Sequence, residues 1–189
     1  MTRRDHHEIP SPAVGHVSFD RVYRRVQRVS RVDFGVPVRV GKVPPPFNGD
    51  LNGAEVIVDD DETWESRVFL ALHLFGHTVQ WNLDEENVKV GAGLAIPVPE
   101  AEIRRVRAYE AEACRYGLAL LHRAGVRGLD GWFSDYAACD YAYLVHYYRT
   151  GEIGPFRAFW RHGTPRVRRL PIPAFTPRRI RSRSAGVVI

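Results

Sequence analysis

The feature that most constrains this fold is an apolar helical pattern in residues 62–81, because it carries two histidines into the interior. Apolar side chains recur there at three- and four-residue steps, at Val68, Phe69, Leu72, Phe75 and Val79. This spacing predicts a helix that is buried over most of its surface. His73 and His77 are four residues apart, so they lie on one face of that helix. The remaining elements must therefore pack around a helix with a polar, titratable patch.

Two imidazoles one helical turn apart can bind a single metal ion, so His73 and His77 are candidate ligands. In metallopeptidase helices of the form H-E-x-x-H, the residue after the first histidine is the glutamate that takes a proton from metal-bound water. Here that position is Leu74, which cannot transfer a proton. Loss of a positioned general base typically costs roughly 10²- to 10⁴-fold in rate. The pattern predicts a metal site with unusual chemistry; the alternative is two buried histidines bonded to the backbone.

The candidate third ligand lies in a second long helix, predicted at residues 99–123. Glu110 follows His77 by 33 residues. Small residues that allow a neighbouring helix to approach closely are Ala111, Ala113 and Gly117. Glu112 points about 200° away from Glu110 around the helix, so only one of the two can serve. The alternative is that both glutamates are solvated and pair with surface arginines.

Residues 110–121 read E-A-E-A-C-R-Y-G-L-A-L-L. With the histidine pair they resemble the ImmA/IrrE-type zinc metallopeptidase domain, whose pattern is H-E-x-x-H followed by E-x-E-A-n-x-F-A-x-x-L-L. The order of predicted elements over residues 17–124 is also similar to that family. The resemblance implies an α+β, zincin-like fold in which a small β-sheet packs against the metal-binding helix and further helices. It also implies Zn²⁺ held by His73, His77 and Glu110, with Glu112 in reserve, and a peptide or protein substrate.

Three further elements are predicted before the metal-binding helix. An amphipathic helix begins near Ser18 and ends before Gly35, with arginines on its polar side. Two β-rich runs at residues 36–40 and 54–58 are predicted to pair as a small sheet. The acidic run at residues 59–61 is predicted to cap the metal-binding helix, and oxygen ligation of an ion is the alternative.

A later aromatic helix, predicted at residues 135–149, carries the candidate catalytic residues Asp140, Tyr143 and His146. Asp140, or Asp135 before it, could orient a ligand imidazole or act as a base, and a tyrosine or histidine could stabilise an oxyanion. The alternative is that these aromatic residues pack in the core. A short apolar helix near residues 156–160 is predicted to close the domain.

We divide the chain into a flexible leader at residues 1–15, a zincin-like domain at residues 16–163 and an Arg/Pro-rich basic tail at residues 164–189. Residues 153–189 hold nine arginines and no acidic residue, whereas residues 1–152 carry a net charge of −4. The tail is therefore predicted to be an extended or disordered arm that binds nucleic acid or an acidic partner, or that only aids solubility. Its candidate contact residues are Arg178, Arg179, Arg181 and Arg183.

No apolar run approaches the roughly 18–20 residues needed to cross a bilayer, and the first residues lack the apolar segment of a secretory signal. We therefore expect a cytoplasmic protein with no membrane partner. Cys114 and Cys139 are expected to be buried thiols, as is usual in a reducing compartment.

Three functions are consistent with this sequence. The first is a zinc metallopeptidase-like hydrolase that uses a base other than the usual glutamate. The second is a catalytically silent metal-binding module with a regulatory or interaction role. The third is a non-haem iron enzyme, because two histidines and one carboxylate also bind Fe²⁺.

Overall fold

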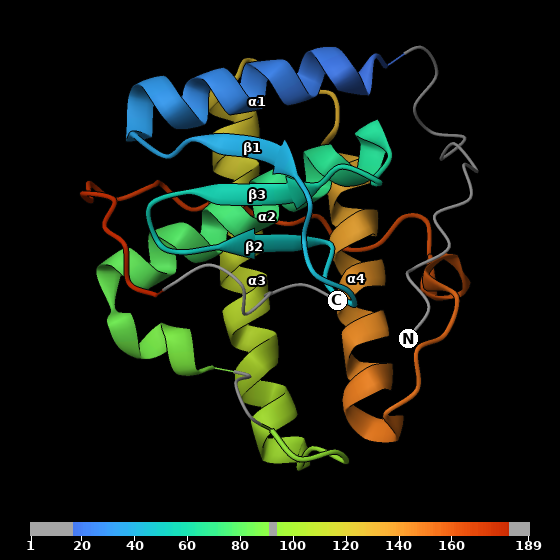
Figure 1. The fold of residues 1–189 in the computed structure, drawn as a ribbon. Helices are drawn as coiled ribbons and strands as arrows, with labels where there is room; N and C mark the ends of the chain where they lie inside the picture. Colours follow the sequence, from blue (N-terminus) through green and yellow to red (C-terminus); the bar gives the residue numbers. More distant parts are fainter. Residues whose placement is uncertain (1–16, 91–93, 182–189) are drawn as a thin grey trace.

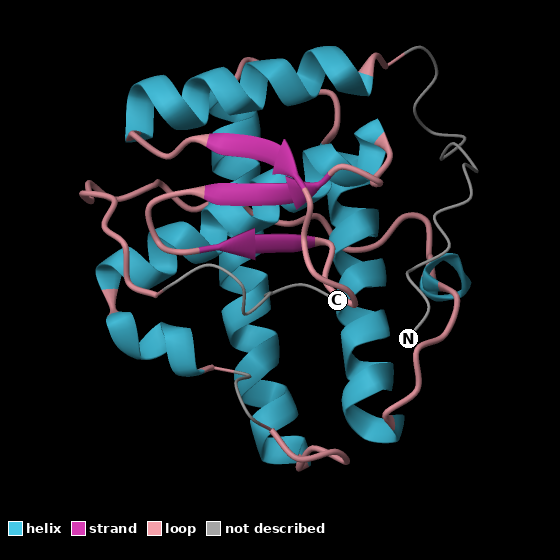
Figure 2. Ribbon diagram, viewed as in Figure 1, coloured by secondary structure: helices cyan, strands magenta, loops and turns pink. Residues whose placement is uncertain are grey.

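A computed structural model of the chain describes residues 17–90 and 94–181. Within these residues it is an α+β fold with four α-helices and one three-stranded mixed sheet (Figure 1, Figure 2). The elements are α1 (Phe19–Phe34), β1 (Val38–Gly41), β2 (Gly49–Leu51), β3 (Val56–Asp59), α2 (Trp64–Leu83), η1 (Glu85–Lys89), α3 (Glu100–Arg123), α4 (Asp130–Thr150) and η2 (Phe156–Phe159). The predicted α+β class is confirmed. The predicted leader, residues 1–15, lies outside the described residues.

The sheet has the strand order β1-β3-β2. β1 pairs in parallel with β3, with Val38 opposite Val56, so the two predicted β-rich runs do form a sheet. β2 pairs antiparallel with β3 and was not predicted, because Asn48 and Gly49 read as a turn. A Cβ at Gly49 would lie 2.6 Å from Cδ1 of Leu74 in α2, so a side chain here would require Leu74 to shift. The missing side chain lets β2 approach the central helix.

Helix α2 is the centre of the core and contacts α1, α3, β2 and β3 (Figure 1). Every residue from Val68 to Trp81 is buried. The helix is capped by Thr63, whose side chain accepts a hydrogen bond from the Ser66 N–H, as expected of a threonine at this position. The prediction that the acidic run caps α2 is wrong, because the Asp59 carboxylate accepts hydrogen bonds from Val43 and Asp61 instead.

Two glycines bring α2 and α3 into backbone contact. A Cβ on Gly76 would lie 2.1 Å from the carbonyl oxygen of Ala113, and a Cβ on Gly117 would lie 2.7 Å from that of Leu72. Both distances are far below the contact distance of non-bonded atoms. The predicted close approach at Ala113 and Gly117 is therefore present, and it sets the separation between the two helices that carry the candidate ligands.

Residues 164–181, which we call the C-terminal strap, contain no helix or strand and run along the surface of the domain (Figure 2). The strap is tied by hydrogen bonds to α2, α3, α4 and the loop after β2. Its contacts are Val167 N–H to Ser134 Oγ, Leu170 N–H to Arg115 O, Arg178 N–H to Asn82 Oδ1 and Ile180 N–H to Asn52 O. The described part of the predicted tail is thus extended and held against the domain.

The strap's arginines are partly used inside the molecule. Arg181 pairs with the buried Asp50 at 2.8 Å and lies over the ring of Trp81. Arg178 pairs with Glu85 at 2.6 Å. Arg179 is exposed, and Arg183 lies outside the described residues. Two of the four predicted contact arginines therefore fasten the strap to the domain.

Among the described helices, none combines the length and apolar character that spanning a membrane requires. Cys114 and Cys139 are both buried and unbridged, as predicted. Cys139 donates to the carbonyl oxygen of Phe156 at 3.4 Å, which ties η2 to α4.

Candidate metal centre

Three side chains from α2 and α3 meet at one point in the core. His73 Nε2 lies 3.0 Å from His77 Nε2 and 3.0 Å from Glu110 Oε2, and His77 Nε2 lies 3.2 Å from the same oxygen. The three atoms form a nearly equilateral triangle. The structure therefore brings together the three residues that the sequence predicts as ligands.

The size of this triangle matches the spacing of ligands around a small cation. Zn²⁺ bonds of about 2.0–2.1 Å at a tetrahedral angle separate two ligand atoms by roughly 3.3 Å. His73, His77 and Glu110 would hold such an ion through two ring nitrogens and one carboxylate oxygen, a donor set found in zinc sites. The donor set and its spacing both fit zinc.

Gln80 fixes which ring nitrogen of His77 donates a hydrogen bond. Its side-chain amide nitrogen donates to the backbone carbonyl of Tyr109 and to the Glu112 carboxylate, at 2.9 and 2.8 Å. Its oxygen must then face His77 Nδ1, which lies 2.9 Å away and acts as the donor. The lone pair of neutral His77 is consequently on Nε2, the atom that points at the triangle. A ligand histidine held in this way is typical of metal sites.

Glu112 takes part in this network and lies outside the triangle. It accepts from Gln80, and so supports His77 indirectly. Glu112, the reserve candidate for a metal ligand, is therefore a hydrogen-bond partner of Gln80 and not a member of the triangle. The ring of Tyr109 packs on His77 with a centroid distance of 4.4 Å, and its hydroxyl accepts from the Trp81 indole N–H. Aromatic packing and hydrogen bonds together hold His77 in one orientation.

The second ring nitrogen of His73 contacts a thiol. His73 Nδ1 lies 3.4 Å from Cys114 Sγ on α3. The Phe69 ring stacks on the His73 ring at a centroid distance of 5.5 Å. Burial raises the pKa of the Cys114 thiol, so at neutral pH the thiol keeps its proton. Cys114 therefore contacts a candidate ligand from the side opposite the triangle.

The electrostatics of the triangle favour a negative Glu110. Burial raises the pKa of the Glu110 carboxyl, but His77 and His73 lower it by more, and the net pKa lies well below the ordinary glutamate value. Burial lowers the pKa of His73, but Cys114 and Glu110 raise it by more. Glu110 is thus ionised at neutral pH, which is the form that binds a cation.

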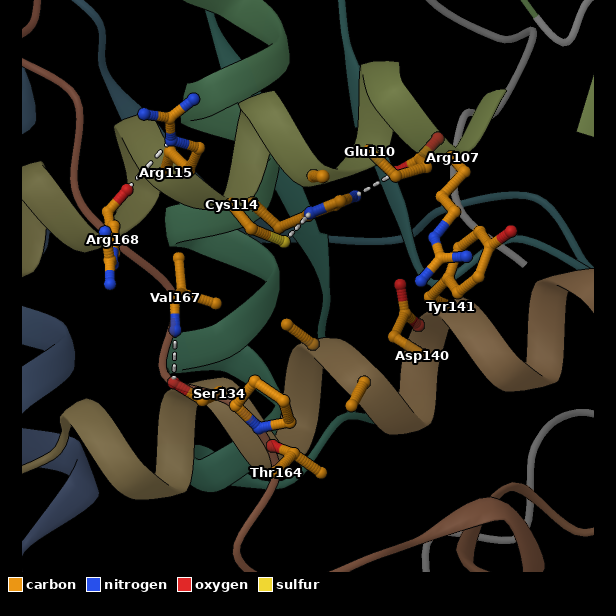
Figure 3. A pocket seen from close by; sticks show the side chains of 15 residues that line it. Arg107, Glu110, Cys114, Arg115, Ser134, Asp140, Tyr141, Thr164, Val167 and Arg168 are labelled. Atoms are coloured by element: carbon orange, nitrogen blue, oxygen red, sulfur yellow. Dashed lines mark hydrogen bonds and ion pairs between the residues drawn. The ribbon is translucent and has the colours of Figure 1, made fainter. Parts of the chain in front are cut away.

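A cavity of about 440 Å³ opens beside the triangle, between α3, α4 and the strap (Figure 3). Glu110 lies at one end of it and Ser134 and Thr164 lie toward the other (Figure 3), and His73 also lines it. Small apolar residues make much of its wall, and arginines from α3 and the strap stand at its edge. These are Ala111, Ala137, Ala138 and Val167, with Arg107, Arg115 and Arg168. Two of the three triangle residues, His73 and Glu110, therefore border a space that could hold a small ligand or a side chain.

Of the three predicted catalytic residues, only Asp140 lines this cavity. Asp140 is buried and lines it, with its side chain pointing from α4 toward α3 (Figure 3). Tyr143 is buried against Phe156 and Phe159. His146 packs beside Phe159 at a centroid distance of 5.2 Å. Tyr143 and His146 thus lie on the side of α4 that faces η2, and only Asp140 is near the triangle.

Asp135, the other predicted acid, anchors the strap. Its carboxylate accepts hydrogen bonds from the N–H and hydroxyl of Thr164 and from the N–H of Gly163. Burial raises the pKa of Asp135, but these hydrogen bonds lower it by more. Asp135 therefore fixes the point where the strap starts, which is also a wall of the cavity.

Leu74 points away from the cavity. It is fully buried, and its Cδ1 atom occupies the space above Gly49 in β2. The position that holds a glutamate in H-E-x-x-H helices is here part of the packing between α2 and the sheet.

The sequence contains a signal for Gln80 that pattern reading missed. Gln80 follows His77 by three residues, so on a helix the two side chains are neighbours. The Cys114 and Arg107 positions could not be found this way, since their place beside His73 or the cavity depends on how α3 packs.

Neither a protein-family model, nor a curated protein, nor a solved structure matches this chain.

Gln80→Leu is expected to lower zinc affinity roughly 10- to 100-fold, because His77 loses the acceptor that orients it. Zinc affinity would be measured by competition with a chelator. Gln27→Leu is the matched control: Gln27 on α1 donates to the Val38 carbonyl on β1 and contacts none of the three triangle residues, so it should leave zinc affinity unchanged. Equal affinities for wild type and Gln80→Leu would show that Gln80 does not position His77.

Proposed function

We propose that this chain is a zinc-binding protein with a zincin-like fold and the activity of a metallopeptidase-like hydrolase, in which His73, His77 and Glu110 hold the ion. The observation that carries the proposal is the convergence of three ligand atoms, within 3.2 Å of one another, at the end of a cavity. The sequence resemblance to ImmA/IrrE-type domains supports the same ligand set.

The residues present fit a zinc ion in number, type and spacing. A bound zinc ion polarises a substrate carbonyl and lowers the pKa of water to roughly 7. Gln80 keeps His77 in the required tautomer, and Glu110 supplies the negative charge that offsets part of the ion's charge. The chain itself therefore orients the ligands beside the cavity that His73 and Glu110 line.

Asp140 is the residue we assign as the proton acceptor in place of the missing glutamate. Besides Glu110, it is the only carboxylate among the described residues that line the cavity. Leu74 cannot take this role, since it is an apolar side chain packed against Gly49. Arg107 and Tyr141, which pack on each other at the edge of the cavity, are placed to bind a polar group of the substrate.

Asp140→Asn is expected to lower the rate of peptide or amide cleavage by about 10²- to 10⁴-fold, because the amide cannot accept the proton. Zinc content should stay equal to that of the wild type, which separates a proton-transfer role from a ligand role. His146→Asn is the control: it changes a titratable residue of the same helix that lies away from the cavity, and its rate should match the wild type. A zinc-loaded wild type that cleaves no peptide or amide would refute the hydrolase.

A second function, a metal-binding module without turnover, is favoured by Leu74. This residue stands where H-E-x-x-H helices have the proton-accepting glutamate, and its side chain is packed against Gly49. In that case zinc binds as in the first proposal, and neither wild type nor Asp140→Asn shows cleavage. The third option, an iron enzyme, is tested by metal analysis after aerobic and anaerobic purification. Zinc in both samples would exclude iron.

A further inference from the structure

Helix α1 and the adjoining β1 carry a cationic surface that the metal centre does not use. We call it the α1 arginine face; its members are Arg21, Arg24, Arg25, Arg28, Arg31 and Arg39. All six side chains are exposed. The apolar side of α1 is meanwhile buried in the core through Val22, Tyr23 and Val26.

A hollow of about 320 Å³ lies at the centre of this face, between α1 and β1. Arg24, Arg28, Arg31 and Arg39 line it together with Gln27. Gln27 donates to the Val38 carbonyl at 2.7 Å, which fastens the helix to the strand below the hollow. Four guanidinium-bearing residues therefore surround one concavity whose floor is fixed.

The arginines of α1 are close enough to repel one another. Neighbours at three- and four-residue steps, such as Arg24 with Arg28 and Arg28 with Arg31, are like-charge pairs that destabilise an isolated helix. No described acidic side chain forms an ion pair with Arg21, Arg25, Arg28 or Arg31. Arg24 pairs with Asp20 at 3.3 Å and Arg39 with the largely buried Glu55 at 2.7 Å, but the two arginine side chains remain 71% and 68% exposed to solvent. A polyanion would relieve the repulsion along the whole face.

We propose that the α1 arginine face binds the phosphodiester backbone of a nucleic acid. The guanidinium group matches phosphate in a bidentate geometry. The stretch from Arg21 to Arg31 covers about 15 Å of helix, the axial length of roughly four nucleotides of one duplex strand. The face thus presents successive arginines along a length over which a nucleic acid presents successive phosphates.

Two other partners fit this face less well. A helix that lies on a membrane inserts its apolar side into the lipid, and the apolar side of α1 is buried in the core. A protein partner without a run of acidic groups would leave four of the six arginines without a counter-charge, because the described acidic side chains pair only with Arg24 and Arg39. Binding through phosphate contacts alone would be independent of sequence and sensitive to salt.

The test is fluorescence anisotropy with a short labelled DNA duplex and a short labelled single-stranded RNA, each of mixed sequence, over a series of salt concentrations. The triple variant Arg24→Gln/Arg28→Gln/Arg31→Gln is expected to bind at least about tenfold more weakly at low salt. For the duplex, the slope of log K against log salt should fall in magnitude by about 2–3, since each phosphate contact contributes about 0.9. An effect on only one of the two probes would identify the form of nucleic acid that is bound.

The matched control is Arg104→Gln/Arg105→Gln/Arg127→Gln, which removes the same charge from exposed positions of α3 and the loop after it. It should bind like the wild type, and neither variant should melt below the wild type, which would show that both are folded. The proposal is overturned if the wild type binds neither probe, or if control and test variants weaken binding equally. Binding to vesicles of anionic phospholipid without binding to either nucleic acid would also overturn it.

Discussion

Purified His73→Ala protein is expected to bind zinc roughly 10²- to 10³-fold more weakly than the wild type. The estimate divides the roughly 10–16 kcal/mol of a four-ligand structural zinc site equally among its ligands. His73 Nε2 is 3.0 Å from each of the other two ligand atoms, so its loss leaves a pair that holds a cation weakly. Elemental analysis and chelator competition would measure the effect.

Glu110→Gln should also weaken zinc binding, since the amide keeps the shape of the side chain and removes its charge. His146→Ala is the control, because His146 packs beside Phe159 and away from the triangle. If His73→Ala and wild type hold zinc equally, the ion is bound elsewhere and the candidate centre is wrong.

Gly76→Ala is expected to lower the free energy of unfolding by about 3 kcal/mol or more, at the upper end of the range for overpacked cores. The new Cβ would lie 2.1 Å from the carbonyl oxygen of Ala113. The obstacle is backbone, so no side-chain rotation relieves it, and the helices must separate by on the order of 1 Å. Metal bonds tolerate about 0.2 Å, so the same change should also weaken zinc binding. Denaturant unfolding would measure stability.

Gly128→Ala is the matched control. A Cβ at Gly128 would meet nothing within 4 Å, and a surface substitution of this kind is usually within about 0.5 kcal/mol of the wild type. Gly76→Ala protein with wild-type stability and zinc affinity would mean that α2 and α3 are farther apart than described.

The period of apolar residues in the sequence was sufficient to predict the long helices. It was not sufficient to predict strand β2 or the path of the strap. α1, α2 and α3 each bury a stripe or most of their surface, which leaves a repeating signal in the sequence. β2 spans only Gly49–Leu51, and a three-residue strand is too short to alternate. The strap has no period at all, because each of its contacts, such as Val167 with Ser134, is made once.

His73 and His77 could be predicted as candidate ligands because histidine spacing on one helix is a local property. Glu110 was found with the help of the family pattern, since the sequence alone does not say which carboxylate α3 turns toward α2. Tyr143 and His146 were chosen by helical spacing with Asp140, yet side chains three residues apart diverge enough for α4 to direct Tyr143 toward Phe156. Which side of α4 faces the cavity is decided by the packing of α3 and the strap.

The strap also orders events during translation. His73, His77 and Glu110 precede the cavity wall contributed by Thr164, Pro165, Val167 and Arg168. Arg168 follows Glu110 by 58 residues, so a ribosome working at about 5–20 residues per second adds it roughly 3–12 s later. All three candidate ligands are therefore synthesised several seconds before the strap residues of the cavity wall. During that interval the cavity lacks this wall, and metal ions in solution can reach the candidate ligands from that side.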